Sequence, residues 1–190
     1  MSDVQTIVCF GDSLTNGARD ELHRTYPFEL TRLLHADGRT DWWCLNHGVN
    51  GETTSHMAER AYAVLAPNRG ARFVLFLGGT NDTKVPLPPG VYRENVEAIV
   101  TLALTLSIEP VLGLLPPVYG PGLPCYSQVE GNRRIALYNE MLTDLVAEHK
   151  LRSCDFRGYS ADLYSDGIHL NHDGYVRMAH DWYQAITGSL

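Results

Sequence analysis

TIVCFGDSL, residues 6–14, is the stretch that decides the fold of this chain. Its first five residues are an apolar run that predicts a short buried β-strand. The chain then turns at Gly11 and presents the hydroxyl of Ser13 at the carboxyl end of that strand. Ligands of open α/β sheets bind just beyond the carboxyl ends of the strands, so Ser13 is a candidate nucleophile. A serine nucleophile also needs a base, a carboxylate to orient the base, and donors for an oxyanion.

Apolar segments of two kinds alternate along the chain. Short runs such as residues 73–77 (FVLFL) are apolar throughout, which is typical of a parallel strand covered on both faces. Longer segments repeat apolar residues at helical spacing. Predicted strands cover residues 6–10, 42–45, 73–77, 111–115 and 151–156, and predicted helices cover residues 26–36, 53–66, 91–106, 130–150 and 171–187. The buried face of the first helix is expected to hold Phe28, Leu30, Leu33 and Leu34. This alternation predicts an α/β fold, a doubly wound parallel sheet with helices on both faces.

The composition limits the class of protein. The chain has 190 residues, 44% hydrophobic and 19% charged, and we expect one globular domain over residues 1–190. The net charge of -7 gives no basic surface, so we expect neither nucleic acid nor an anionic membrane as a partner. No apolar run approaches membrane-spanning length, and residues 1–6 lack the features of a signal peptide. A cytoplasmic protein without membrane insertion is expected.

The four cysteines are scattered and form no Cys-x-x-Cys pair. Cys9, Cys44 and Cys154 fall in predicted strands, so buried free thiols in a reducing cytosol are expected. Cys125 lies in a loop.

The loops that follow parallel strands meet at one edge of the sheet, and here they carry the unusual residues. These loops are residues 11–14 (GDSL), 46–52 (NHGVNGE), 78–82 (GGTND) and 165–170 (SDGIHL). In the last of them, Asp166 and His169 are separated by a turn that contains Gly167. The carboxylate of Asp166 can accept the imidazole Nδ1–H, which leaves Nε2 free to take a proton from Ser13.

Two further residues supply oxyanion donors. Gly51 offers a backbone N–H with no side chain to obstruct a substrate carbonyl, and Asn81 offers a side-chain amide. With the N–H of Ser13 they would form a three-donor oxyanion hole. Taken singly, Ser13 could instead cap a helix and Asn81 a turn. Their shared position after strands favours a catalytic site.

Four blocks of the sequence resemble the SGNH/GDSL hydrolase family, in the order of that family and across nearly the whole chain. They are GDSLTNG (residues 11–17), GVNGETT (48–54), GTND (79–82) and DGIH (166–169). Asn50 and Glu52 depart slightly, because Ser and Asp are common at these places. Neither residue carries the chemistry, although Asn50 could narrow the pocket.

The resemblance implies a role for each site residue. Ser13 would be the nucleophile, His169 the base and Asp166 its partner. Gly51 and Asn81 would be oxyanion donors. The resemblance also implies a flavodoxin-like three-layer α/β/α fold with a five-stranded parallel sheet.

Other polar residues near the predicted site have structural interpretations. Asp12 is expected to bond backbone amides rather than act as a second acid. Loop or solvated helix-end positions are expected for His47, His172, Asp173, Arg133 and Arg134. Tyr119 and Tyr126 either line a cleft or simply pack.

The leading interpretation is a serine hydrolase that cleaves carboxylic esters through an acyl-enzyme, with no cofactor and no metal. The prolines of residues 116–128 predict a semi-rigid wall rather than an amphipathic lid, so small, short-acyl esters are the expected substrates. A lysophospholipase or an acyl-thioesterase would use the same machinery. The sequence leaves the oligomeric state open.

Two alternatives belong to other classes. A metal-dependent phosphoesterase could use polar residues of the same loops, namely Asp12, Asn81, Asp82, His169 and His172. The Asp-x-His and Gly-Asn-His segments of two-metal phosphatases are missing, which disfavours it. A non-catalytic ligand-binding protein would leave the spacing of Asp166 and His169 without a purpose.

Overall fold

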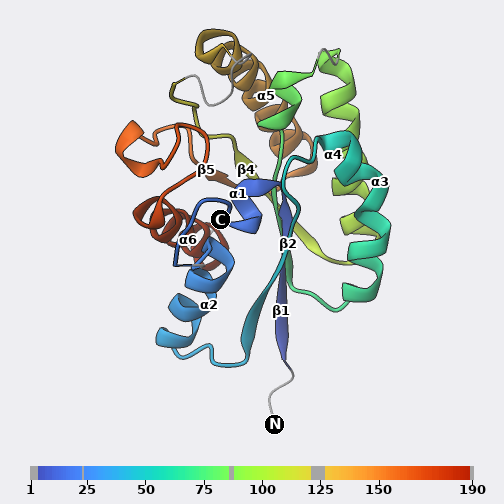
Figure 1. Ribbon diagram of the computed structural model, residues 1–190. Helices are drawn as coiled ribbons and strands as arrows, with labels where there is room; N and C mark the ends of the chain where they lie inside the picture. The colour runs from blue at the N-terminus through green and yellow to red at the C-terminus, as the bar shows by residue number, and fades with distance from the viewer. Residues whose placement is uncertain (1–3, 23, 86–87, 121–126, 189–190) are drawn as a thin grey trace.

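A five-stranded parallel sheet forms the middle layer of the molecule (Figure 1). The computed structural model describes residues 4–22, 24–85, 88–120 and 127–188. The strand order is β2-β1-β3-β4-β5, which is the flavodoxin-like order. The strands are β1 (Gln5–Gly11), β2 (Trp42–Gly48), β3 (Phe73–Leu77), β4 (Glu109–Leu114) and β5 (Arg152–Asp155). The predicted three-layer α/β fold is confirmed.

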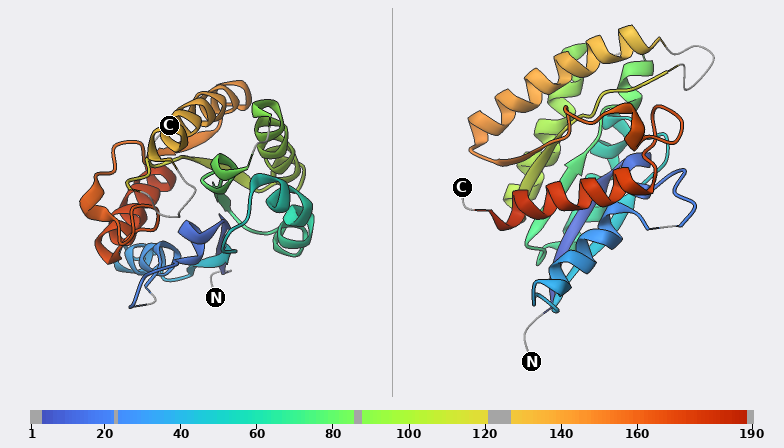
Figure 2. Two further views of the ribbon diagram at one scale, coloured as in Figure 1. Left: turned by 45° about the horizontal axis from the view of Figure 1, so that its top comes forward. Right: turned by 90° about the vertical axis from the view of Figure 1, so that its left-hand side faces the viewer.

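Helices cover both faces of this sheet (Figure 2). On one face α2 packs against α6, and on the other α3 packs against α4, which also contacts α5. The helices are α1 (Ser13–Asn16), α2 (Tyr26–Ala36), α3 (Thr54–Leu65), α4 (Pro89–Thr105), α5 (Gln128–His149) and α6 (His172–Thr187). Single 3-10 turns are η1 (Ala66–Asn68), η2 (Asn81–Lys84) and η3 (Ala161–Leu163).

The core lies around the central strand β3, which is buried at all five positions. The rings of Phe10 and Phe76 meet across β1 and β3, with centroids 6.3 Å apart. Outer strand β2 is only half-buried, so apolar residues beside it lack cover. The expectation that Phe28 faces inward is wrong for this reason. Its surface is 49% exposed, and the strand nearest to it, β2, is the edge strand of the sheet.

Side chains cap the helices that begin at the carboxyl edge of the sheet. Thr53 is the N-cap of α3, in a capping box in which its N–H donates to the ring Nδ1 of His56 at 3.3 Å. Asn171 caps α6, where its side chain accepts from the N–H of Gly174 at 2.9 Å. These caps fix the loops that carry Gly51 and His169.

The predicted state of the thiols is confirmed in part. Cys9 and Cys154 are buried and free, whereas Cys44 is free but half-buried in the outer strand. Cys125 lies outside the described residues. In the part of the chain that the structure describes, no helix has the length and apolar character needed to cross a membrane.

Candidate active site

Ser13 is held at the end of β1 by a tight turn. It is the first residue of α1, and the Asp12 side chain caps that helix by accepting the N–H of Leu14 at 2.9 Å. Gly11 is needed just before this turn, because a Cβ there would clash with the carbonyl of Leu77 and the hydroxyl of Thr15. Ser13 is a buried polar residue, with 7% of its surface exposed.

His169 lies between Ser13 and Asp166 and contacts both. The Nε2 atom of His169 lies 3.1 Å from Ser13 Oγ, and its Nδ1 lies 2.8 Å from Asp166 Oδ2. The second carboxylate oxygen, Oδ1, accepts the backbone N–H groups of Ile168 at 3.0 Å and His169 at 2.8 Å. Burial alone would raise the pKa of Asp166, but the hydrogen bonds from His169 and Ile168 outweigh it and lower the pKa to about 2. Asp166 is therefore a carboxylate at neutral pH.

The turn between these two residues is braced by the segment after β4. Gly167 has φ +81°, and a Cβ there would clash with the backbone of Tyr119. The N–H of Tyr119 donates to the carbonyl of Gly167 at 2.6 Å, and the hydroxyl of Tyr164 donates to the carbonyl of Pro117 at 2.6 Å. Tyr119 thus fixes the loop of Asp166 and His169. Tyr126 lies outside the described residues.

Gly51 and Asn81 occupy adjoining loops. The Asn81 amide nitrogen donates to the carbonyl of Glu52 at 3.0 Å, and Lys84 Nζ donates to the amide oxygen at 3.1 Å. An amide carries two N–H groups, and this bond uses one of them. Gly51 has φ +80° and open space where a side chain would lie. Asn50 accepts from the side chain of Asn16 at 2.9 Å, which ties the Gly51 loop to α1.

Asp82 locks these two loops together. Its buried carboxylate accepts the N–H of Thr54 at 3.0 and 3.1 Å and the Thr54 hydroxyl at 2.5 Å. Burial raises the pKa of Asp82, while the bonds from Thr54 lower it. The side chain therefore bonds the first residue of α3, just after the Gly51 loop.

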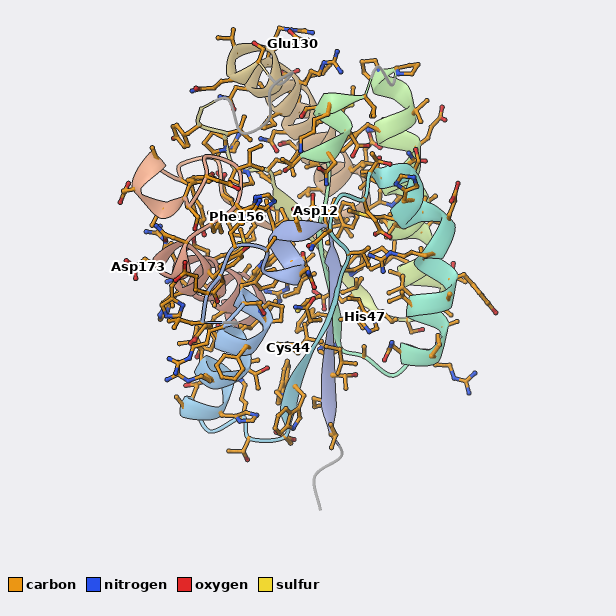
Figure 3. All side chains as sticks on the ribbon, viewed as in Figure 1. Asp12, Cys44, His47, Glu130, Phe156 and Asp173 are labelled. Carbon is orange, nitrogen blue, oxygen red and sulfur yellow. The ribbon has the colours of Figure 1, made fainter. Side chains whose placement is uncertain are left out.

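Asp12 bonds a backbone amide, as predicted, but only with one oxygen. It lies where β1 meets α1 (Figure 3), and among the described residues its buried Oδ2 has no hydrogen-bond partner. Burial is the main reason that the pKa of Asp12 is raised to about 7, and the charge of Asp82 adds to it.

Asp12→Asn is expected to stabilise the protein at pH 8 more than at pH 5. The raised pKa means that the folded protein holds a proton that the unfolded chain releases between about pH 4 and 7, so this group's contribution to stability falls as pH rises through that window. Asparagine keeps the acceptor for Leu14 and removes the buried charge. We expect a gain of about 1–3 kcal/mol at pH 8 by denaturant unfolding. Exposed Asp144→Asn is the control, and an equal effect of Asp12→Asn at both pH values would contradict the expectation.

Three residues that contact the site were missed or misjudged. Arg134 was expected to be solvated, but its guanidinium donates to the carbonyls of Thr83 at 3.2 Å and Val85 at 2.8 Å. Arg19 Nε lies 3.4 Å from Asp166 Oδ2. Arg60 hydrogen-bonds to Glu52. The sequence does not signal these contacts, because each arginine reaches a partner in a distant part of the chain, Thr83 for Arg134, Asp166 for Arg19 and Gly11 for Arg60.

Potential metal ligands gather elsewhere. Among the described residues, the group of three that lies close enough to share an ion is Glu97, Glu148 and His149, on α4 and α5. His172 instead lies with its Nδ1 3.8 Å from Asp20 Oδ1.

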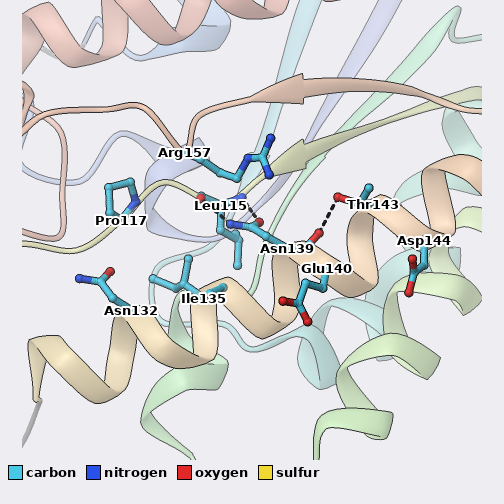
Figure 4. Close-up of a pocket in the computed structure, with 10 residues that line it drawn as sticks. Leu115, Pro117, Asn132, Ile135, Asn139, Glu140, Thr143, Asp144 and Arg157 are labelled. Carbon is cyan, nitrogen blue, oxygen red and sulfur yellow. Dashed lines mark hydrogen bonds between the residues drawn. The ribbon is translucent and has the colours of Figure 1, made fainter.

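Two of the cavities that the described residues line lie near the carboxyl ends of the strands. One of about 550 Å³ lies between α5 and the ends of β4 and β5, lined by Leu115, Asn139 and Arg157 among others (Figure 4). Ser13 and His169 are not among the described residues that line it. A second, of about 380 Å³, is lined by Asp166 and Arg19.

The family model of the GDSL-like lipase/acylhydrolase family matches residues 9–177. The chain belongs to this family. The predicted resemblance is confirmed, and with it an enzyme of the GDSL lipase/esterase type. Esterase TesA of Pseudomonas aeruginosa is 26% identical over 172 residues, which cover 87% of this chain and 79% of TesA.

Solved structures of other hydrolases share the fold. The lipase/acylhydrolase from Enterococcus faecalis superposes with a TM-score of 0.83 at 23% identity, over 97% of this chain and 96% of that one. The psychrotrophic esterase EstA from Pseudoalteromonas sp., in a structure inhibited by monoethylphosphonate, gives a TM-score of 0.78 at 21% identity, over 96% of each chain. At these identities the likeness concerns the fold.

Proposed function

We propose that the protein hydrolyses carboxylic esters through an acyl-enzyme formed on Ser13. The observation that carries this proposal is the continuous row from Ser13 Oγ through both nitrogens of His169 to Asp166 Oδ2, with separations of 3.1 and 2.8 Å. A serine is a weak nucleophile on its own, and an adjacent imidazole held by a carboxylate is the arrangement that activates it.

The proposed reaction has two halves. Ser13 Oγ attacks the carbonyl carbon while His169 Nε2 takes the hydroxyl proton. The ester C–O bond then breaks, His169 returns the proton to the departing alkoxide, and the alcohol leaves. Water repeats the sequence at the acyl carbon, which releases the acid and restores Ser13. The N–H groups of Ser13, Gly51 and Asn81 would stabilise the oxyanion in both halves.

Asn81→Ala is expected to lower kcat by about 10²- to 10³-fold, the usual effect of losing one oxyanion donor. KM should change less, because the donor acts on charge that develops in the transition state. Asn68→Ala is a matched control, since Asn68 also donates its amide to a backbone carbonyl, that of Val64, at 2.8 Å. An Asn81→Ala variant with unchanged kcat would remove Asn81 from the oxyanion hole.

The expected substrates are small, short-acyl esters. The described part of the loop after β4 supports this, because the contacts of Tyr119 and Pro117 hold it against the Asp166 loop as a fixed wall. A lysophospholipase or an acyl-thioesterase remains the alternative on the same machinery. A cytoplasmic location stays a prediction.

We expect kcat/KM for p-nitrophenyl esters to fall as the acyl chain lengthens from acetyl to palmitoyl. All assays contain EDTA, and activity should survive it. Each added methylene gains only where the protein buries it, and a fixed wall leaves long chains in water. A preference for long chains would favour the lysophospholipase alternative. Loss of activity with EDTA that a divalent metal restores would favour the phosphoesterase.

A further inference from the structure

The guanidinium of Arg60 bonds residues on both sides of the chain turns that carry the proposed oxyanion donors Ser13 and Gly51. Arg60 of α3 has a side chain that is 21% exposed. Its Nε donates to the two carboxylate oxygens of Glu52 at 2.8 and 2.7 Å, and one terminal nitrogen donates to the carbonyls of His47 at 2.9 Å and Gly11 at 3.2 Å. The guanidinium carbon also lies 4.4 Å above the ring of Phe10.

These partners come from two segments, the end of β1 and residues 46–52 at the end of β2, and both lead to proposed oxyanion donors. Gly11 ends β1, two residues before Ser13. His47 lies in β2, which leads into the loop of Gly51. Glu52 follows Gly51, and its own carbonyl accepts the Asn81 amide at 3.0 Å. The side chain of Arg60 therefore holds the end of β1, the end of β2 and the Gly51 loop at fixed separations.

We propose that Arg60 is a positioning residue for the oxyanion hole, an inference that rests on the proposed ester hydrolysis. Donors stabilise a developing oxyanion only if they already point at it before the reaction. The planar fork of arginine can bond a carboxylate and carbonyls at once, whereas a lysine ammonium at the end of a flexible stem cannot keep the same geometry. Loss of Arg60 would leave the carboxylate of Glu52 unpaired and let the Gly51 loop shift.

Arg152 provides a matched control at the opposite end of the sheet. Its side chain is 18% exposed, and it donates to Glu109 at 2.9 Å and to the carbonyls of Ala185 at 3.2 Å and Gly188 at 2.8 Å. Both arginines thus pair one carboxylate and two carbonyls. Arg152 begins β5, far along the strands from Ser13. Arg60→Gln and Arg152→Gln should therefore lower Tm by similar amounts and differ in catalysis.

The experiment measures Tm, kcat and KM for p-nitrophenyl acetate in Arg60→Gln, Arg60→Lys, Arg152→Gln and Ser13→Ala. We expect Arg60→Gln to lower kcat by about tenfold or more while KM changes by less than about threefold, and Arg60→Lys to fall between it and the parent. Arg152→Gln should keep kcat within about twofold, because it touches no oxyanion donor.

Unchanged kcat in Arg60→Gln, with Ser13→Ala inactive, would overturn the role of Arg60 and leave the proposed hydrolysis standing. Activity in Ser13→Ala would instead overturn the proposed hydrolysis. If Arg60→Gln does not fold, Arg60→Lys decides, and parent-like kcat in that variant overturns the role. A fall in kcat of equal size in Arg152→Gln would show a general structural effect and would also overturn it.

Discussion

Ser13→Ala is expected to lower kcat for ester hydrolysis by on the order of 10⁴-fold or more, the size seen when a triad serine is removed. The hydroxyl lies 3.1 Å from His169 Nε2, and the alanine variant has no atom that could form the acyl-enzyme. Folding should change little, because Asp12 and not Ser13 caps α1. The measurement is steady-state hydrolysis of p-nitrophenyl acetate together with Tm.

Covalent labelling makes this test specific. After treatment with an organophosphonate, the mass of the parent protein should increase by that of a single adduct. Peptide mapping should place this adduct on Ser13. Ser153→Ala, at an exposed position in β5, is the control and should be labelled like the parent. An adduct on another residue, or parent-like hydrolysis by Ser13→Ala, would show that Ser13 is not the nucleophile.

The fold could be predicted because its signals are local and repeated. The bounds of α2 agree with the predicted helix, and all five predicted strands appear in the sheet. Phe28 was misjudged because helical spacing identifies an apolar face without showing whether anything lies against it. In the structure α2 lies against β2, the half-buried outer strand of the sheet, and Phe28 is left half exposed to solvent.

The residues of the candidate site were predictable for a different reason. Ser13 and His169 are 156 residues apart, yet both follow strands that end at the same edge of a parallel sheet. Their supports could not be predicted. Arg60 and Tyr119 act through backbone carbonyls, and a carbonyl has no side chain by which the sequence could mark it as a partner.

His169→Ala and Asp166→Asn are expected to lower kcat by different factors. His169 moves the proton itself, and its loss should lower kcat by about 10⁵- to 10⁶-fold, whereas Asp166→Asn should lower it by about 10³- to 10⁴-fold. Both values would come from the same p-nitrophenyl acetate assay, with Tm as the measure of folding.

The hydrogen bonds of Asp166 explain why an amide is a poor substitute there. Oδ1 accepts two backbone N–H groups, so in Asp166→Asn the amide oxygen would take that place and the NH₂ group would face His169 Nδ1. An NH₂ group donates, which leaves Nδ1 as an acceptor and moves the ring proton to Nε2. Nε2 could then no longer accept the proton of Ser13. Because the loop keeps its backbone bonds, Tm should change little while kcat falls.

Full activity in Asp166→Asn would show that the carboxylate does not set the tautomer of His169, and full activity in His169→Ala would show that the imidazole takes no part in the reaction.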